Sequence, residues 1–283
     1  MSLTILQKSN ASGVPKPGEL IEITGAHALE ASDRALFNVL YQYAHDTGRL
    51  AEANAEWEVP MARLRSAISR HKGNERIRDS LDRLMRVVVN VPFIDGRGVP
   101  RILKTHLFDF FDLPGDEEAA GAVVRYGVPK KLAPVIASSA RWGRIRAEIA
   151  CAMSSKYGIA LYELVRLRAG LERCLETFPI ERFRDLLGVP PGAYTRGNDF
   201  QRSVLGSAVL EVNGLSDVTV SVEVLRKNGP RSAIEAVTVG WQVKTGDAYR
   251  AALRELCASK LGRKARLRGA VEATKIVAPP RIV

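Results

Sequence analysis

The order of amphipathic segments constrains the fold of this chain most, because the same order occurs twice. Three segments in the N-terminal half space their apolar residues three and four apart, as a helix requires, and they cover residues 32–45, 60–69 and 75–86. Ser32 is predicted to cap the first of these helices. Two β-favouring runs, 87–91 and 101–104, then flank an Asp95-Gly96 turn, which is a hairpin signal. Three helices followed by a hairpin is the order of a winged helix.

The second occurrence lies in the C-terminal half. Two helices are predicted at residues 154–169 and 179–187, and a third begins near Asn198 or Asp199. Valines then alternate with other residues on both sides of a turn at 227–230, which predicts a second hairpin. The chain is therefore predicted to be an α+β protein with two tandem winged-helix domains.

The remaining segments give a division into four parts. Residues 1–18 are rich in turn-forming residues and are predicted to be a flexible arm. The first winged-helix domain is assigned to 19–138 and the second to 139–246. Residues 247–283 are predicted to form a helix followed by a basic tail. An acidic segment with aromatic anchors, 108–118, is interpreted as a loop between the units.

Charge favours a polyanionic partner. The chain of 283 residues has a formal net charge of +11, and the charge is concentrated: residues 61–86 carry eight Lys or Arg against three acids. No apolar run approaches the roughly 18 residues that span a bilayer, so no membrane contact is expected and the protein is expected to be cytoplasmic. The three cysteines are widely spaced, which favours reduced thiols over a disulfide framework or a zinc site.

Double-stranded DNA is the polyanion that a winged helix binds with its third helix. In the second unit, four residues at or just before the start of that helix could read bases: Arg196, Asn198, Gln201 and Arg202. An arginine can pair bidentately with guanine, and asparagine or glutamine with adenine. The alternative is that these residues form a solvated helix face without any contact to bases.

In the first unit, a basic cluster lies at the turn and start of the third helix and includes Arg70, Lys72, Asn74, Arg76 and Arg78. Such a dense set favours contact with phosphates, although ion pairs with acids one turn away are the alternative. Two more sets could make contacts that do not depend on sequence, namely Arg226 and Lys227 at the second hairpin tip, and Lys260, Arg263, Lys264, Arg266 and Arg268 in the tail. A polar hairpin tip without any DNA contact is the alternative for the first of them.

No catalytic motif is found, so no cofactor, metal or active site is expected. There is no P-loop, and the four histidines are far apart, without the paired spacing that a metal-dependent nicking enzyme needs. Tyr157 and Tyr162 could serve as strand-nicking nucleophiles, but on a helix they diverge, so core tyrosines are favoured. Carboxylate metal ligands near Asp109 and Asp112 are the less favoured interpretation of the acidic segment. A nicking or priming enzyme is kept as an alternative class.

Short motifs in the second unit resemble a known family. They are Ser155-Lys156-Tyr157, Leu161-Tyr162-Glu163-Leu164, Leu187-Gly188-Val189, Phe200-Gln201-Arg202 and Glu211-Val212-Asn213. Residues 150–245 thereby resemble the iteron-binding plasmid replication initiators. The first unit resembles that family only in architecture and in its basic third helix. One departure is that the family tends to have consecutive basic residues where this chain has Gln201-Arg202-Ser203.

The resemblance implies a plasmid-associated protein with two binding modes. A monomer would bind directly repeated iterons at the origin with both units, help to melt the origin and recruit the host initiator and replicative helicase. A homodimer, formed through the first unit, would bind an inverted repeat in the operator and repress its own gene. The alternative is a dimeric winged-helix transcriptional repressor that binds a palindrome and has no initiator activity.

Overall fold

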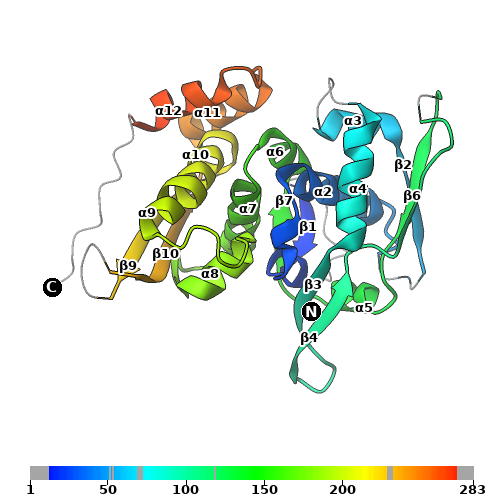
Figure 1. Cartoon of the computed structure of the whole chain (residues 1–283), viewed down its shortest axis with the longest axis horizontal. Coiled ribbons are helices and arrows are strands. Elements are labelled where there is room, and N and C mark those ends of the chain that lie inside the picture. Colours follow the sequence, from blue (N-terminus) through cyan, green and yellow to red (C-terminus); the bar gives the residue numbers. More distant parts are fainter. Residues whose placement is uncertain are drawn as a thin grey trace.

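Two helix-and-sheet units lie side by side in the molecule (Figure 1). The computed structural model describes residues 13–272, except residues 51, 53, 69–72, 118 and 228–231. Helix α7 (Lys156–Arg168) lies between the two units and contacts α2 and β7 of the first and α10 of the second. Every residue from Tyr157 to Val165 is buried, as expected for a helix that is covered on all sides.

The first unit contains the predicted order of three helices and a hairpin. The helices are α2 (Ala31–Asp46), α3 (Met61–Ile68) and α4 (Asn74–Arg86), and the hairpin strands are β3 (Val88–Ile94) and β4 (Pro100–His106). Ile77 and Leu84 on the apolar face of α4 are buried, as their spacing predicts. The prediction of Ser32 as the cap of the first helix is wrong. Glu30 is the cap, because it forms a capping box with Asp33, whose side chain accepts a hydrogen bond from the Glu30 backbone.

A three-stranded antiparallel sheet completes the core of the first unit. Its strands are β2 (Glu56–Pro60), β5 (Phe110–Asp112) and β6 (Val123–Gly127), in the order β2-β6-β5, whereas β3 and β4 form a separate two-stranded sheet. The segment 108–118 is therefore not entirely a loop. Phe108 is 1% exposed and its ring packs edge-on against Phe37, so aromatic burial draws this acidic segment onto the unit.

The prediction of a flexible arm at residues 1–18 is wrong for residues 13–18, which are the part of it that the structure describes. Strand β1 (Val14–Pro17) is buried and pairs antiparallel with β7 (Trp142–Ile145). Its two prolines fit because β1 is an edge strand, where a missing backbone donor is tolerated. Residues 1–12 of the predicted arm lie outside the described residues. Four short helices complete this part: α1 (Gly18–Ile21), η2 (Ala26–Ala28), α5 (Leu132–Ala137) and α6 (Ala147–Ala152).

The second unit repeats the order, with a strand between its first two helices. After α7 come β8 (Leu175–Pro179), α8 (Ile180–Leu187), the segments α9 (Gly197–Phe200), η3 (Gln201–Leu205) and α10 (Gly206–Leu215) of one continuous third helix, and the hairpin of β9 (Val218–Arg226) and β10 (Ile234–Val243). The sheet order is β8-β10-β9. Gly188 has a φ of 71° and ends α8, because glycine adopts this left-handed conformation without strain. Residues 228–230 of the predicted turn lie outside the described residues.

Two helices follow the second hairpin where one helix and a tail are predicted. They are α11 (Gly246–Cys257) and α12 (Arg263–Glu272), and they lie along the same end of the molecule as α10 and α6 (Figure 1). The first half of the predicted tail is therefore helical. Residues 273–283 lie outside the described residues.

Candidate nucleic-acid interface

The third helix of the second unit presents polar side chains at its start. Phe200 and Val204 are buried and anchor it, whereas Arg196 and Asn198 are exposed. Arg202 is 82% exposed, and its guanidinium forms an ion pair with the Asp199 carboxylate at 3.1 Å. The exposed pair contributes little to stability, so the guanidinium can leave it for another acceptor. Gln201 is half-buried beside them. The structure thus brings together the four residues predicted here.

A single π-helical turn interrupts this third helix. Over Gln201–Leu205 the hydrogen bonds span five residues, and the Gly206 backbone N–H donates to the Gln201 carbonyl. Such turns are rare and often occur at functional sites. A Cβ at Gly206 would lie 3.3 Å from the Gln201 oxygen, so the missing side chain eases the close approach. Periodicity did not predict the turn, because one extra residue hardly changes the apolar pattern over so short a helix.

The hairpin of the second unit is tied to the start of the third helix. Arg226 donates through Nη1 to the Ser232 carbonyl, and its guanidinium nitrogens lie against Gly197, where a Cβ would be 3.1 Å away. Arg226 thus has a structural role that the sequence did not predict. Lys227 is exposed at the end of β9, beyond this contact.

The predicted basic cluster of the first unit divides into residues with different environments. Arg70 and Lys72 lie outside the described residues. Asn74 is half-buried at the first position of α4, and Arg76 is exposed. Arg78 forms a bidentate ion pair with Glu117, with distances of 2.6 and 3.1 Å, and this carboxylate raises the pKa of the guanidinium. Arg78 therefore ties α4 to the segment before β6. Among the described residues of this cluster, Arg76 is the one exposed cation without a partner in the protein.

A second arginine of α4, which the sequence did not single out, has a structural role. Arg83 donates to both carboxylate oxygens of Asp33, at 2.8 and 3.0 Å, and Asp33 is fully buried. This pair joins α4 to the start of α2. Its sequence signal is weak, because the two residues are 50 positions apart and either could equally face solvent.

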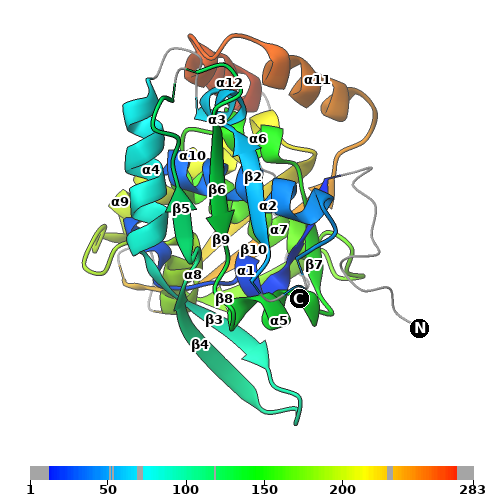
Figure 2. The ribbon, with the colours of Figure 1, turned by 90° about the vertical axis from the view of Figure 1, so that its right-hand side faces the viewer.

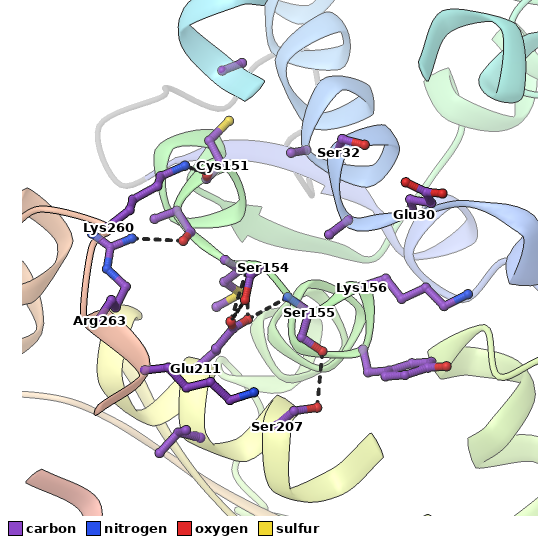
Figure 3. Close-up of a pocket in the computed structure, with 18 of the residues that line it drawn as sticks. Glu30, Ser32, Cys151, Ser154, Ser155, Lys156, Ser207, Glu211, Lys260 and Arg263 are labelled. Atoms are coloured by element: carbon purple, nitrogen blue, oxygen red, sulfur yellow. Dashed lines mark hydrogen bonds between the residues drawn. The ribbon is translucent and has the colours of Figure 1, made fainter. Parts of the chain in front are cut away.

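A cleft of about 980 Å³ separates the third helices of the two units. Its walls come from the start of α2, from α4, from α10 and from α12. Its floor is the junction of α6 and α7, which Figure 3 shows between Ser32 of α2 and Glu211 of α10. On the floor, the Glu211 carboxylate accepts hydrogen bonds from the Ser154 and Ser155 backbone N–H groups, at 3.1 and 2.9 Å, and from the Ser154 hydroxyl. Glu211 of α10 thereby links the second unit's third helix to the junction, whereas the Ser155 hydroxyl caps α7 by accepting a hydrogen bond from the Gly158 N–H.

The two tyrosines that could have been nucleophiles are core residues, as favoured. Tyr162 is fully buried and its hydroxyl accepts a hydrogen bond from the Arg146 backbone at 3.2 Å. Tyr157 packs edge-on against Tyr194, and burial raises its pKa to about 12. Among the described residues, no group of three or more His, Cys, Asp or Glu side chains is arranged to hold a metal ion. No helix in the described part of the chain is both long and apolar enough to cross a membrane.

Two family models match the chain. One, described as initiator replication protein, WH1, matches residues 14–166, and the other, described as initiator Rep protein, WH2, matches residues 179–239. The chain belongs to the initiator replication protein family. This confirms the resemblance and the fold of two tandem winged-helix domains, and it makes the protein a replication initiator with DNA-binding winged helices. The WH1 match includes most of α7, which the sequence pattern assigns to the second unit and which the structure places against both.

Other comparisons add little to this initiator's family assignment. A crystal structure of selenomethionine derivatives of domains 2 and 3 of RctB covers 75% of this chain and 80% of that chain, with 13% sequence identity and a TM-score of 0.44. That similarity is too low to support a conclusion. No curated protein matches the chain.

Proposed function

We propose that this initiator binds directly repeated iterons at a plasmid origin, with the third helices of both units on one DNA duplex. The proposal rests on where the third helices of the two units lie in the molecule. Helices α4 and α9 lie on the near face in Figure 1, and after a quarter turn both lie toward the same edge in Figure 2. One duplex along that face could meet both helices. A winged helix docks its third helix in the major groove with the start of the helix near base edges.

In this proposal the second unit reads the sequence. Asn198 and Arg202 are exposed at the helix start, and Arg196 and Gln201 flank them. Their donors match adenine and guanine edges in the major groove. Lys227 lies on the hairpin that is tied to this helix start and would contact a phosphate.

The first unit would mainly contact the DNA backbone. Arg76 is exposed on α4, whereas Arg78 and Arg83 have carboxylate partners in the protein. A single free cation on a helix face suits contact with phosphates better than readout of several bases. Arg70 and Lys72, in the turn before α4, would add to that contact.

The first unit would also form the homodimer that represses the initiator's own gene. Its hairpin β3–β4 has one face on the core, with Val89 and Val91 buried, and one face toward solvent that is apolar near the hairpin turn. On the outer face Ile94 is 65% exposed and Ile102 is 70% exposed. A two-stranded sheet with an exposed apolar face favours burial against a second copy, since large exposed apolar patches mark interaction sites. The dimer would bind an inverted repeat in the operator.

Origin melting and recruitment of the host initiator and replicative helicase complete the proposal, and they rest on membership of the family. A dimeric transcriptional repressor without initiator activity is the alternative. It differs in binding DNA only as a dimer on a palindrome, and in leaving directly repeated DNA unbound.

Electrophoretic mobility shifts on duplex DNA from around the chain's own gene separate the two functions. The initiator is expected to give a ladder of discrete complexes on a directly repeated array, and Arg202→Ala is expected to weaken each step. Arg250→Ala, an exposed arginine of α11 paired with Asp247, is the matched control and should leave the ladder unchanged. A single complex confined to a palindrome would favour the repressor. A smear that ignores sequence would contradict both.

A further inference from the structure

The helical pair α11–α12 lies outside both family matches, since the second match ends at residue 239. Helix α12 nevertheless packs closely on α10. Leu267 is 3% exposed and lies against Gly214 of α10, where even one added carbon would collide with it. The pair is therefore a fixed part of the second unit's surface.

One arginine fastens the pair to the junction of the two units. Arg263 is 7% exposed and donates to three carbonyls at the end of α11, the closest being that of Ala258 at 2.8 Å. It also donates to the Ala152 carbonyl at the end of α6, at 3.0 Å. Lys260 donates to the neighbouring Cys151 carbonyl at 2.9 Å (Figure 3). The start of α12 is thereby held over the floor of the cleft.

The basic residues of this segment fall into two groups. Lys260, Arg263 and Arg266 have partners inside the protein, the last of them Glu255 at 2.7 Å. Lys264 and Arg268 are exposed and have no ion-pair or hydrogen-bond partner among the residues that the structure describes. These two lie four positions apart, so they share one face of α12. That face presents two exposed charges that no described carboxylate neutralises.

Lys264 lines the cleft, and Arg76 of α4 lines it from the other wall. Cationic side chains outnumber carboxylates in the lining, where Arg76, Arg83, Lys156, Lys260, Arg263 and Lys264 are joined by Glu30, Asp79 and Glu211. Of the acids, Glu211 accepts hydrogen bonds from the Ser154 and Ser155 N–H groups. Of the cations, Arg83 and Arg263 are paired with Asp33 and Glu255. Arg76, Lys156 and Lys264 have no carboxylate ion-pair partner among the described residues. The cleft therefore attracts anions and lies between the two helices that are proposed to enter DNA grooves.

We propose that α12 is a third DNA-contacting element of this initiator. Lys264 and Arg268, with Arg76 opposite, hold the sugar–phosphate backbone of the duplex segment that joins the groove entered by α4 to the groove entered by α9–α10. The inference rests on the proposed function. Successive major grooves are about 34 Å apart, and duplex DNA carries one charge per about 1.7 Å, so the joining segment brings many phosphates to the cleft. Lysine and exposed arginine neutralise such charges without reading sequence.

The test compares the double variant Lys264→Ala/Arg268→Ala with Lys130→Ala/Lys131→Ala, which removes the same charge from exposed residues beside α5. The probes are a duplex selected by the wild-type protein from a random pool, and a scrambled duplex of equal length. The α12 variant is expected to bind both duplexes about tenfold more weakly, with a salt slope shallower by about 2, because two phosphate contacts are lost. The control is expected to bind as the wild type does. Both variants should keep the wild-type Tm, because the four side chains are exposed.

DNA with uncharged linkages at chosen positions shows which phosphates α12 contacts. Methylphosphonate linkages placed between the two grooves should weaken the wild type more than the α12 variant, in which only the Arg76 contact with that segment remains to be lost. The inference is overturned if the α12 variant keeps the wild-type affinity and salt slope, or if the control weakens equally. If the wild type shows no preference for the selected duplex over the scrambled one, the proposed function fails instead.

Discussion

The two hairpins of this initiator have the same place in the order of elements and different surroundings. Strands β9 and β10 join β8 in a three-stranded sheet, and their inner residues, including Val220 and Val239, are buried against the unit. Strands β3 and β4 form a sheet of their own and leave Ile94 and Ile102 in solvent. The same order of elements therefore provides a wing tied to the proposed DNA-reading helix in one unit and an exposed, partly apolar surface in the other.

The third helices differ in the same way. In α4 the arginines Arg78 and Arg83 are paired with acids from other segments, whereas Arg202 in the second unit is paired with its neighbour Asp199 and is largely exposed. The third helix of the first unit is held by these ion pairs as well as by its buried apolar face. That of the second unit is fastened by apolar packing and leaves its polar residues available.

The largest expected effect lies at the junction of the units. The Glu163 carboxylate on α7 accepts hydrogen bonds from Lys16 at 2.9 Å and from Asn38 at 2.6 Å, and the Lys16 and Glu163 side chains are nearly fully buried. Glu163→Ala would leave a buried charge unpaired and is expected to lower the free energy of unfolding by about 3–5 kcal/mol, measured by denaturant titration. Exposed Glu172→Ala is the matched control and should change it by less than about 0.5 kcal/mol. An unchanged stability for Glu163→Ala would show that the junction does not depend on this pair.

The next largest effect distinguishes the two hairpins by their role in dimerisation. Ile102→Lys places a charge on the exposed apolar face of β4 and is expected to weaken dimerisation at least about a hundredfold, or about 3 kcal/mol, by sedimentation equilibrium. Leu225→Lys makes the same change on β9, at a residue that is 38% exposed, and should leave the dimer intact. Equal effects of the two substitutions, or none of either, would contradict the assignment of the dimer to the first unit.

A smaller effect concerns sequence readout. Arg202→Ala is expected to reduce the preference for selected over scrambled DNA by about 1–3 kcal/mol, the value of one bidentate base contact. Competition binding at a fixed salt concentration measures this preference. Stability should not change, because the lost ion pair with Asp199 is exposed. A uniform loss on both DNAs would instead assign Arg202 to a phosphate.

The smallest effect is expected for Arg76→Ala on α4. It should weaken binding to selected and scrambled DNA by the same factor and make the salt slope shallower by about 1, since one phosphate contact is removed. Salt titrations of both complexes measure it. If Arg76→Ala lowered the preference for the selected DNA as Arg202→Ala does, both units would read bases and the proposed division would be wrong.

The elements that the sequence predicts well are those with strong local signals. The helix periodicity around Leu84 and the Asp95-Gly96 turn identify their structures without help from distant residues. The strand at 14–17 has no such signal, because its prolines favour a loop and its pairing with β7 is supplied by residues more than 120 positions away. The local pattern there favours a loop, whereas pairing with β7 favours a strand, and the pairing determines the structure.

The candidate interface shows the same limit. Residue types alone predict exposed polar side chains at the start of the third helix, and Asn198 and Arg202 are exposed there. Residue types do not separate Arg76 from Arg78, since only the fold brings Glu117 to one of the two. In the same way, burial of Arg263 against carbonyls distinguishes it from Lys264, although the two are adjacent in the chain. Partners that are distant in sequence determine which cations remain free for DNA.

Hydroxyl-radical footprinting of the monomeric protein on one copy of its selected site tests the central claim most directly. If both units bind one duplex, two protected patches are expected about one helical turn apart on the same face of the DNA. Arg202→Ala should remove protection at one patch, and Arg76→Ala should weaken protection at the other. A single patch, or two patches that disappear together with either substitution, would contradict the account of two units with separate roles on the DNA.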